Sequence, residues 1–267
     1  MTKKGFVLWA LLLSVAQTAH PLRYSEIRLP EGISPFAFAH DLFGNFYIID
    51  RTNATLYKLD LNGLILGEIS SYESERFFDP VAISLFGLKI SILDRGKNEI
   101  VFFDKNLSYL ASIKIEPNLQ PLTFFATPGR IIILDRSGKE IFFYQGKSWE
   151  SNTIRINYDP TFSEIGAASN RKKFFLASKN FILKLDYSGK IEKRLALDGI
   201  SPPLSVFSRF VCFLVNDSLA VSDEELEKIN FIELDRAKLP IDIFAEQDVI
   251  YLLFRESIIA IEYEKGN

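Results

Sequence analysis

The sequence of 267 residues is poor in the residues that build metal and redox sites, with one cysteine and two histidines. Cys212 cannot form a disulfide within the chain, and its place in the apolar run FVCFLV favours a small buried side chain. His20 and His40 are too few for a histidine-rich zinc site, which disfavours lyases built on one. No nucleophile-elbow motif accompanies His40, so a serine hydrolase is not indicated.

An excess of charge of one sign is also missing. The chain has 31 Lys and Arg against 34 Asp and Glu, spread along its length, for a net charge of −3. Without a basic stripe, nucleic acid is not expected as a partner. Hydrophobic residues make up 48% and charged residues 24%, which is typical of a folded globular protein. The 24 Phe and 10 Tyr favour β structure, because aromatic side chains suit pleated, buried surfaces.

The apolar run near the start, GFVLWALLLSVA, is too short to cross a bilayer as a helix. It follows Lys3 and Lys4, and small residues suited to cleavage come at its end and shortly after it. We interpret residues 1–19 as a secretory signal peptide, cleaved after Ala16 or Ala19. Residues 20–267 are then expected to form a single exported domain, periplasmic or extracellular, with no integral membrane segment.

A repeat follows from prolines that open apolar stretches, namely Pro35, Pro80, Pro121, Pro203 and Pro240. The steps between them are 45, 41, 82 and 37 residues. Because 82 is twice 41, a further repeat is expected to open near Phe162. This spacing predicts six units of about 40 residues, the length of four short strands with their turns.

The units predict an all-β fold, a six-bladed β-propeller with four-stranded antiparallel blades. Within a unit, apolar stretches such as YIID and LYKLD alternate with short polar turns, as in a meander of hairpins. Stretches such as FVCFLV and RIIILD are apolar on both faces, so each needs a sheet on both sides. Sheets packed face to face around an axis meet that need. A two-sheet sandwich would require alternating strands and would leave the period unexplained.

The last unit, ending ESIIAIEYEKGN, supplies only three strands. The segment Tyr24–Leu29 resembles the fourth strands of other units, because Ile27-Arg28-Leu29 repeats the apolar-basic-apolar pattern of Ile113-Lys114-Ile115. We therefore expect it to lie beside Ser257–Tyr263 and close the ring. A basic residue on an outermost strand also discourages further strand pairing.

The first unit, LPEGISPFAFAHDLFGNFYIIDRTNATLYKLDLNGLILGEI, resembles an NHL-type repeat. NHL-type propellers serve as protein-binding platforms, as RNA readers and, in a few cases, as enzymes, so the fold does not fix the function. The resemblance and the composition together favour an exported binding or scaffolding propeller for a protein or glycan partner. No catalytic residue and no cofactor are indicated for it.

An Asp-Arg pair ends the second strand of each of the first three units. We expect Asp50, Asp94 and Asp135 to accept hydrogen bonds from backbone amides a residue or two further on, which would fix the turn.

The arginines that follow, Arg51, Arg95 and Arg136, have two interpretations. They could form an arc on one face that grips carboxylates or sulfates, or each could pair with a nearby carboxylate. His40, at the end of a strand near the axis, is a further binding candidate, although it also suits a polar filler or a turn partner.

The segment LPEGISP is similar to an early Glu-Gly segment of gluconolactonase-like propellers. That resemblance implies an alternative function, a divalent-metal-dependent hydrolase with Glu31 as a calcium ligand at the mouth of the central channel. The later Asn and Asp ligand segments of that family have no clear match in this sequence.

Overall fold

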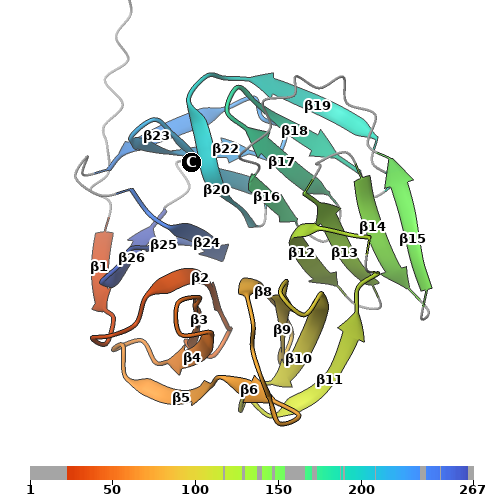
Figure 1. Ribbon diagram of the computed structural model, residues 1–267. Coiled ribbons are helices and arrows are strands. Elements are labelled where there is room, and N and C mark those ends of the chain that lie inside the picture. Colours follow the sequence, from red (N-terminus) through yellow and green to blue (C-terminus); the bar gives the residue numbers. More distant parts are fainter. Residues whose placement is uncertain are drawn as a thin grey trace, which may run out of the picture.

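The computed structural model shows six four-stranded antiparallel sheets around a common axis, the predicted propeller (Figure 1). It describes residues 23–116, 118–127, 130–136, 140–145, 148–153, 166–169, 173–186, 188, 190–207, 209–234, 239–246 and 248–263. The expected signal peptide, His20 and Phe162 lie outside these residues. No helix within the described ranges is long and apolar enough to cross a membrane.

The first strand of each blade lies innermost, and the next strands follow outward in chain order. Blade one contains β2 (Pro35–His40), β3 (Phe46–Asp50), β4 (Thr55–Leu59) and β5 (Ile65–Ile69). Blade two contains β8 (Pro80–Phe86), β9 (Lys89–Asp94), β10 (Glu99–Asp104) and β11 (Tyr109–Lys114). Blade three contains β12 (Pro121–Thr127), β13 (Arg130–Asp135), β14 (Glu140–Gln145) and β15 (Ser148–Thr153).

Blade four contains β16 (Gly166–Ser169), β17 (Phe174–Ser178), β18 (Phe181–Leu185) and β19 (Ile191–Ala196). Blade five contains β20 (Ile200–Phe207), β21 (Phe210–Val215), β22 (Ser218–Asp223) and β23 (Ile229–Glu233). Blade six contains β24 (Asp242–Glu246), β25 (Val249–Leu253), β26 (Ser257–Glu262) and, outermost, β1 (Arg23–Arg28). Thus the outer strand of the last blade comes from the start of the described chain.

This closure is the predicted one. Strand β1 pairs antiparallel with β26, with Tyr24 opposite Ile261 and Ile27 opposite Ile258. Ile27 is buried together with Phe38 and Leu253, in the apolar layer between the last blade and the first. The closing strand is therefore held by hydrophobic packing as well as by its backbone ladder.

Strands that are apolar on both faces are buried on both faces, as the sequence predicted. Strand β21 is an example: Val211, Cys212 and Phe213 are fully buried, in layers that belong to opposite faces of the blade. Burial raises the pKa of the Cys212 thiol, which leaves it a small core side chain.

Among the described residues, Asp50 and Asp94 of the Asp-Arg pairs do not bond amides a residue or two further on, contrary to the prediction. Asp50 accepts the N–H of Asn53, three residues on, and the N–H of Ser34, both at 2.9 Å. Asp94 accepts the N–H groups of Phe78 and Asp79, both at 2.9 Å. Ser34, Phe78 and Asp79 precede the first strand of their blades, so each aspartate holds the segment by which the chain enters its blade.

One element was not predicted. A short hairpin, β6 (Ser71–Tyr72) and β7 (Glu75–Arg76), lies in the link from blade one to blade two. Its Tyr72 hydroxyl donates to Glu99 Oε2 at 3.0 Å. The Tyr72 ring packs on Phe77 and Tyr109, so the hairpin covers the apolar layer between these blades.

Candidate functional site

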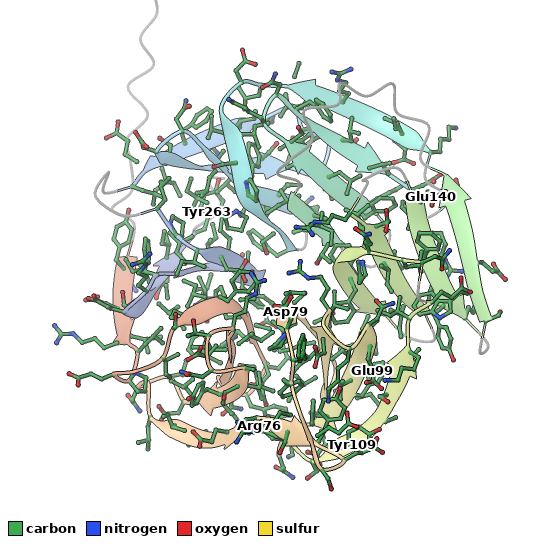
Figure 2. All side chains as sticks on the ribbon, viewed as in Figure 1. Arg76, Asp79, Glu99, Tyr109, Glu140 and Tyr263 are labelled. Carbon is green, nitrogen blue, oxygen red and sulfur yellow. The ribbon has the colours of Figure 1, made fainter. Side chains whose placement is uncertain are left out.

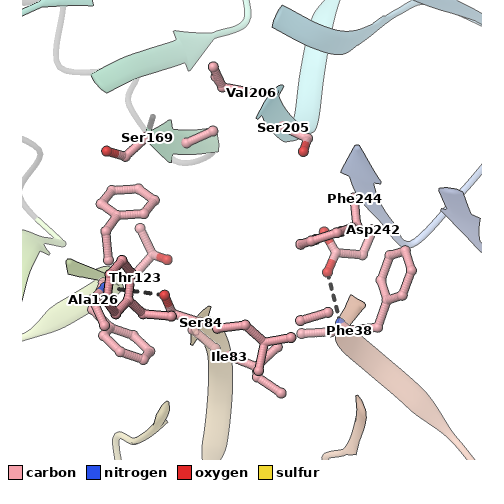
Figure 3. Close-up of a pocket in the computed structure, with 18 of the residues that line it drawn as sticks. Phe38, Ile83, Ser84, Thr123, Ala126, Ser169, Ser205, Val206, Asp242 and Phe244 are labelled. Carbon is pink, nitrogen blue, oxygen red and sulfur yellow. Dashed lines mark hydrogen bonds between the residues drawn. The ribbon is translucent and has the colours of Figure 1, made fainter. Parts of the chain in front are cut away.

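The innermost strands enclose a central channel with a volume of about 1030 Å³ (Figure 3). Its wall combines apolar side chains with polar and charged ones. Two serines bridge neighbouring blades: Ser84 Oγ accepts the N–H of Ala126, and Ser205 Oγ accepts the N–H of Ala245, both at 3.1 Å. The innermost strands are sheet edges without a ladder partner on the axis side, so these side chains satisfy N–H groups that would otherwise lack a partner.

Asp242 does the same between the last blade and the first. Its carboxylate accepts the N–H of Phe38 at 3.0 Å and the N–H of Ile243 at 2.9 Å. Burial, opposed by these two hydrogen bonds, raises the pKa of Asp242 to about 7. The channel therefore contains a carboxyl group that changes its charge near neutral pH.

The candidate binding residue His40 lies at the opposite end of β2 from Pro35. Its Nδ1 is 3.2 Å from Glu246 Oε2, and its ring lies 4.7 Å from the rings of both Phe46 and Tyr251, measured between centroids. The side chain is only 9% exposed, and Nε2 has no hydrogen-bond partner among the described residues. His40 thus lines the channel while packing between the first and last blades.

Two of the three candidate arginines converge on one carboxylate. Arg51 Nε lies 2.7 Å from Asp79 Oδ1, and the terminal nitrogen NH2 of Arg95 lies 2.7 Å from Asp79 Oδ2. Asp79 is in the link that enters the second blade (Figure 2). Burial would raise the pKa of Asp79, but hydrogen bonds from both arginines hold it below its ordinary value. Arg136 is exposed, and its backbone N–H donates to the Gln120 carbonyl.

Glu31 lies in an exposed turn between β1 and β2 and does not line the channel. Within the described residues, no three His, Cys, Asp or Glu side chains gather as a metal site would require. A calcium site at Glu31 stays a prediction.

The sequence analysis missed a group of exposed apolar side chains on two turns of blade one. We call Leu42, Phe43, Leu61 and Leu64 the blade-one apolar patch; they are 73%, 66%, 53% and 64% exposed. The two turns are adjacent, because a Cβ added to Gly44 would lie 3.1 Å from the Leu61 side chain.

The turns that carry the patch are fixed by aspartates at the strand ends. Asp41 accepts the N–H groups of Phe43 and Asn45, and Asp60 accepts those of Asn62 and Leu64, at 2.8 to 2.9 Å. The sequence signal was available: large apolar residues occupy turn positions in HDLFGN and LDLNGL, where polar residues are usual.

Comparison with known proteins supports the fold and goes no further. No protein-family model and no curated protein sequence matches the chain. Among solved structures, a streptogramin B lyase has a TM-score of 0.64 at 12% identity, over 91% of this chain and 98% of the other. A protein of Bacteroides fragilis described as exported has a TM-score of 0.65 at 11% identity, over 91% and 96%. The WD40 repeats of RRP9 have a TM-score of 0.64 at 9% identity, over 90% and 97%. At such identities the likeness establishes the propeller fold alone.

Proposed function

We propose that the protein is an exported binding propeller that holds a protein partner on the blade-one apolar patch. The observation that carries the proposal is the exposure of Leu42, Phe43, Leu61 and Leu64, each more than half exposed, on two neighbouring turns. Clustered exposed apolar residues of this kind mark interaction sites. The resemblance of the first unit to an NHL-type repeat agrees with this function, since such propellers serve as protein-binding platforms.

The rigidity of the turns favours binding. Each turn is tied by backbone N–H bonds to a buried or strand-end aspartate, so little conformational freedom is lost when a partner docks. Three of the four patch residues are leucines, which suit the apolar centre of a protein interface better than the hydroxyl-rich surface of a glycan. We therefore choose a protein over a glycan as the partner.

The proposal is tested by photo-crosslinking in the cells that make the protein. A photoreactive phenylalanine analogue replaces Phe43 in one version of the full chain. In the control version it replaces Phe231, which is 54% exposed in the outer strand of the fifth blade. We expect one defined protein adduct at position 43 and none at position 231. Equal adducts at both positions, or none at position 43, would show the proposal to be wrong.

The partner identified in this way is then titrated with purified protein. Burying a leucine in an interface contributes about 1.5 to 3 kcal/mol, so Leu61→Ser with Leu64→Ser is expected to weaken binding at least about tenfold. Unchanged affinity would exclude the patch as the docking site. Sequencing the N-terminus of the secreted chain checks export and the cleavage after Ala16 or Ala19.

The alternative, a calcium-dependent hydrolase, rests only on the LPEGISP resemblance. A bound metal would stabilise the folded state by mass action, so a clear rise in the unfolding midpoint on adding calcium would favour it.

A further inference from the structure

The channel has the size and lining of a small-molecule site. Its volume of about 1030 Å³ is at the upper end of the range of about 300 to 1,000 Å³ usual for ligand pockets. Ile83, Val206 and Phe244 contribute apolar wall, and Ser84 and Ser205 are already engaged by backbone N–H groups. The surface offered to a ligand is therefore divided about equally between apolar and polar atoms.

Asp242 is the group that stands out in this wall. Its two hydrogen bonds, from Phe38 and Ile243, use two of the four acceptor positions of a carboxylate. No cation pairs with it within the described part of the chain, and Asp242 is one of the residues that line the channel. A carboxylate without a counter-ion in an apolar setting is strongly stabilised by a cationic partner.

The surroundings of Asp242 suit an ammonium group. Phe244, two residues along the same strand, lines the channel, and its ring meets that of Phe38 edge-on with centroids 6.1 Å apart. Figure 3 shows Asp242, Phe38 and Phe244 on the same side of the channel. Phe38 is only 3% exposed, so Phe244 is the ring that a ligand can meet here, and a carboxylate on the same side of the channel as an aromatic ring suits an organic cation. A metal ion would need several oxygen ligands, and no such group gathers here among the described residues.

The other charged groups of the channel favour a cation as well. Asp41, His40 and Glu246 lie near the opposite end, where Glu246 contacts His40. Arg130, on the third blade, donates to Gln145 at 2.9 Å. The first and last blades, which lie nearest Asp242, thus contribute the further carboxylates of Asp41 and Glu246, while the Arg130 guanidinium lies on the third blade.

We propose that the central channel binds a small molecule that has an apolar part and one ammonium group, and that the Asp242 carboxylate pairs with that group. Leu42 of the blade-one apolar patch also lines the channel, but Asp242, Phe38 and Phe244 are not part of that patch, so neither proposal depends on the other.

The proposal is tested with phenethylamine, and with 2-phenylethanol as a neutral probe of the same shape. Binding to the mature chain is measured by titration calorimetry. We expect phenethylamine to bind with a dissociation constant at least about tenfold lower than that of 2-phenylethanol, and Asp242→Asn to remove that difference. Equal binding of the two probes, or no binding of phenethylamine at millimolar concentration, would overturn the proposal.

A matched control separates Asp242 from the other channel acids. Glu246→Gln changes a carboxylate at the far end and is expected to alter phenethylamine affinity less than about twofold. A loss as large as that of Asp242→Asn would place the ammonium elsewhere and contradict the proposal. Circular dichroism establishes that both variants are folded.

The pH dependence gives an independent readout. Asp242 is charged above its pKa of about 7, while the amine stays protonated to about pH 10. Affinity for phenethylamine is therefore expected to rise at least about tenfold from about pH 5.5 to about pH 8.5, and Asp242→Asn to show no such rise. His40, Glu246, Asp41 and Arg130 remain in the variant, so a rise of the same size there would refute the role of Asp242.

Discussion

Replacing Asp242 with asparagine is expected to raise the stability of the protein, relative to the parent, more at alkaline pH than in acid. Burial raises the pKa of this carboxyl from 3.8 to about 7. The folded protein therefore holds the proton more tightly than the unfolded chain does. This stronger proton binding stabilises the folded state to its full extent below about pH 4, and the stabilisation is lost as the pH rises through about 7.

The magnitude follows from the shift. A rise of the pKa from 3.8 to about 7, at about 1.4 kcal/mol for each pH unit, corresponds to about 4 kcal/mol. Asparagine is neutral at every pH, but the N–H groups of Phe38 and Ile243 bond different oxygens of Asp242, so only one of them keeps its acceptor in the variant. That lost hydrogen bond lowers the stability of the variant by a similar amount at every pH, so the pH-dependent part of the difference is the test: relative to the parent, the variant should be up to about 4 kcal/mol more stable near pH 8 than it is near pH 4.

The assay is urea denaturation of parent and variant at a series of pH values, which yields the free energy of unfolding of each. Hydrogen bonds hold the pKa values of Asp41, Asp79 and Glu99 below their ordinary values despite burial, so these groups make stability rise with pH. They are common to both proteins and cancel in the difference. A difference that stays constant from about pH 4 to about pH 8 would refute the reasoning, because Asp242 would then be charged throughout that range.

Two matched pairs of substitutions test the fold by the same denaturation assay. Gly63 and Gly32 both have a positive φ (+81° and +88°), but a Cβ on Gly63 would lie 2.2 Å from a backbone oxygen of β1, whereas nothing lies within 4 Å of one on Gly32. Gly32→Ala is expected to cost about 1 kcal/mol and Gly63→Ala at least about 2 kcal/mol, and equal losses would show that β1 does not pack on this turn. Glu225→Ala leaves the Lys184 ammonium, 6% exposed and 2.6 Å from Glu225, without its partner, and is expected to cost about 2 kcal/mol. Glu227→Ala, which breaks a more exposed pair, should cost under about 1 kcal/mol.

The sequence predicted those parts of the structure that depend on a period. Equivalent prolines and equivalent apolar stretches are enough to place six sheets, and the Ile27-Arg28-Leu29 pattern is enough to assign the closing strand. Burial on both faces follows because each sheet is covered by two neighbours.

The site could not be predicted in the same way, because its contacts join residues far apart in sequence. Asp242 bonds Phe38, which lies 204 positions away, across the seam between the last blade and the first. Arg51 and Arg95 meet only because Asp79 lies between their turns, and the repeat predicts Pro80 but not the identity of the residue before it. The repeat period shows which residues are equivalent, but it predicts neither the tilt of the blades nor the path of the links between them.

The predicted signal peptide, a glycan partner, a calcium ligand at Glu31 and a binding role for His40, Arg51, Arg95 and Arg136 stay predictions. Each depends on residues outside the described ranges, or on a ligand whose binding has to be measured.

The sheet of the sixth blade, which joins β1 to β24, β25 and β26, has a consequence for biosynthesis. Its partners Ile27 and Ile258 are 231 positions apart, so the ring cannot be sealed until Ser257–Glu262 has been made. Until then Ser257–Glu262 would have an uncovered edge, and bringing the two ends together carries the large entropic penalty of the longest loop in the molecule. We expect that step to be late and slow, so that loosening either end of the chain would make the complete ring reopen at this one sheet.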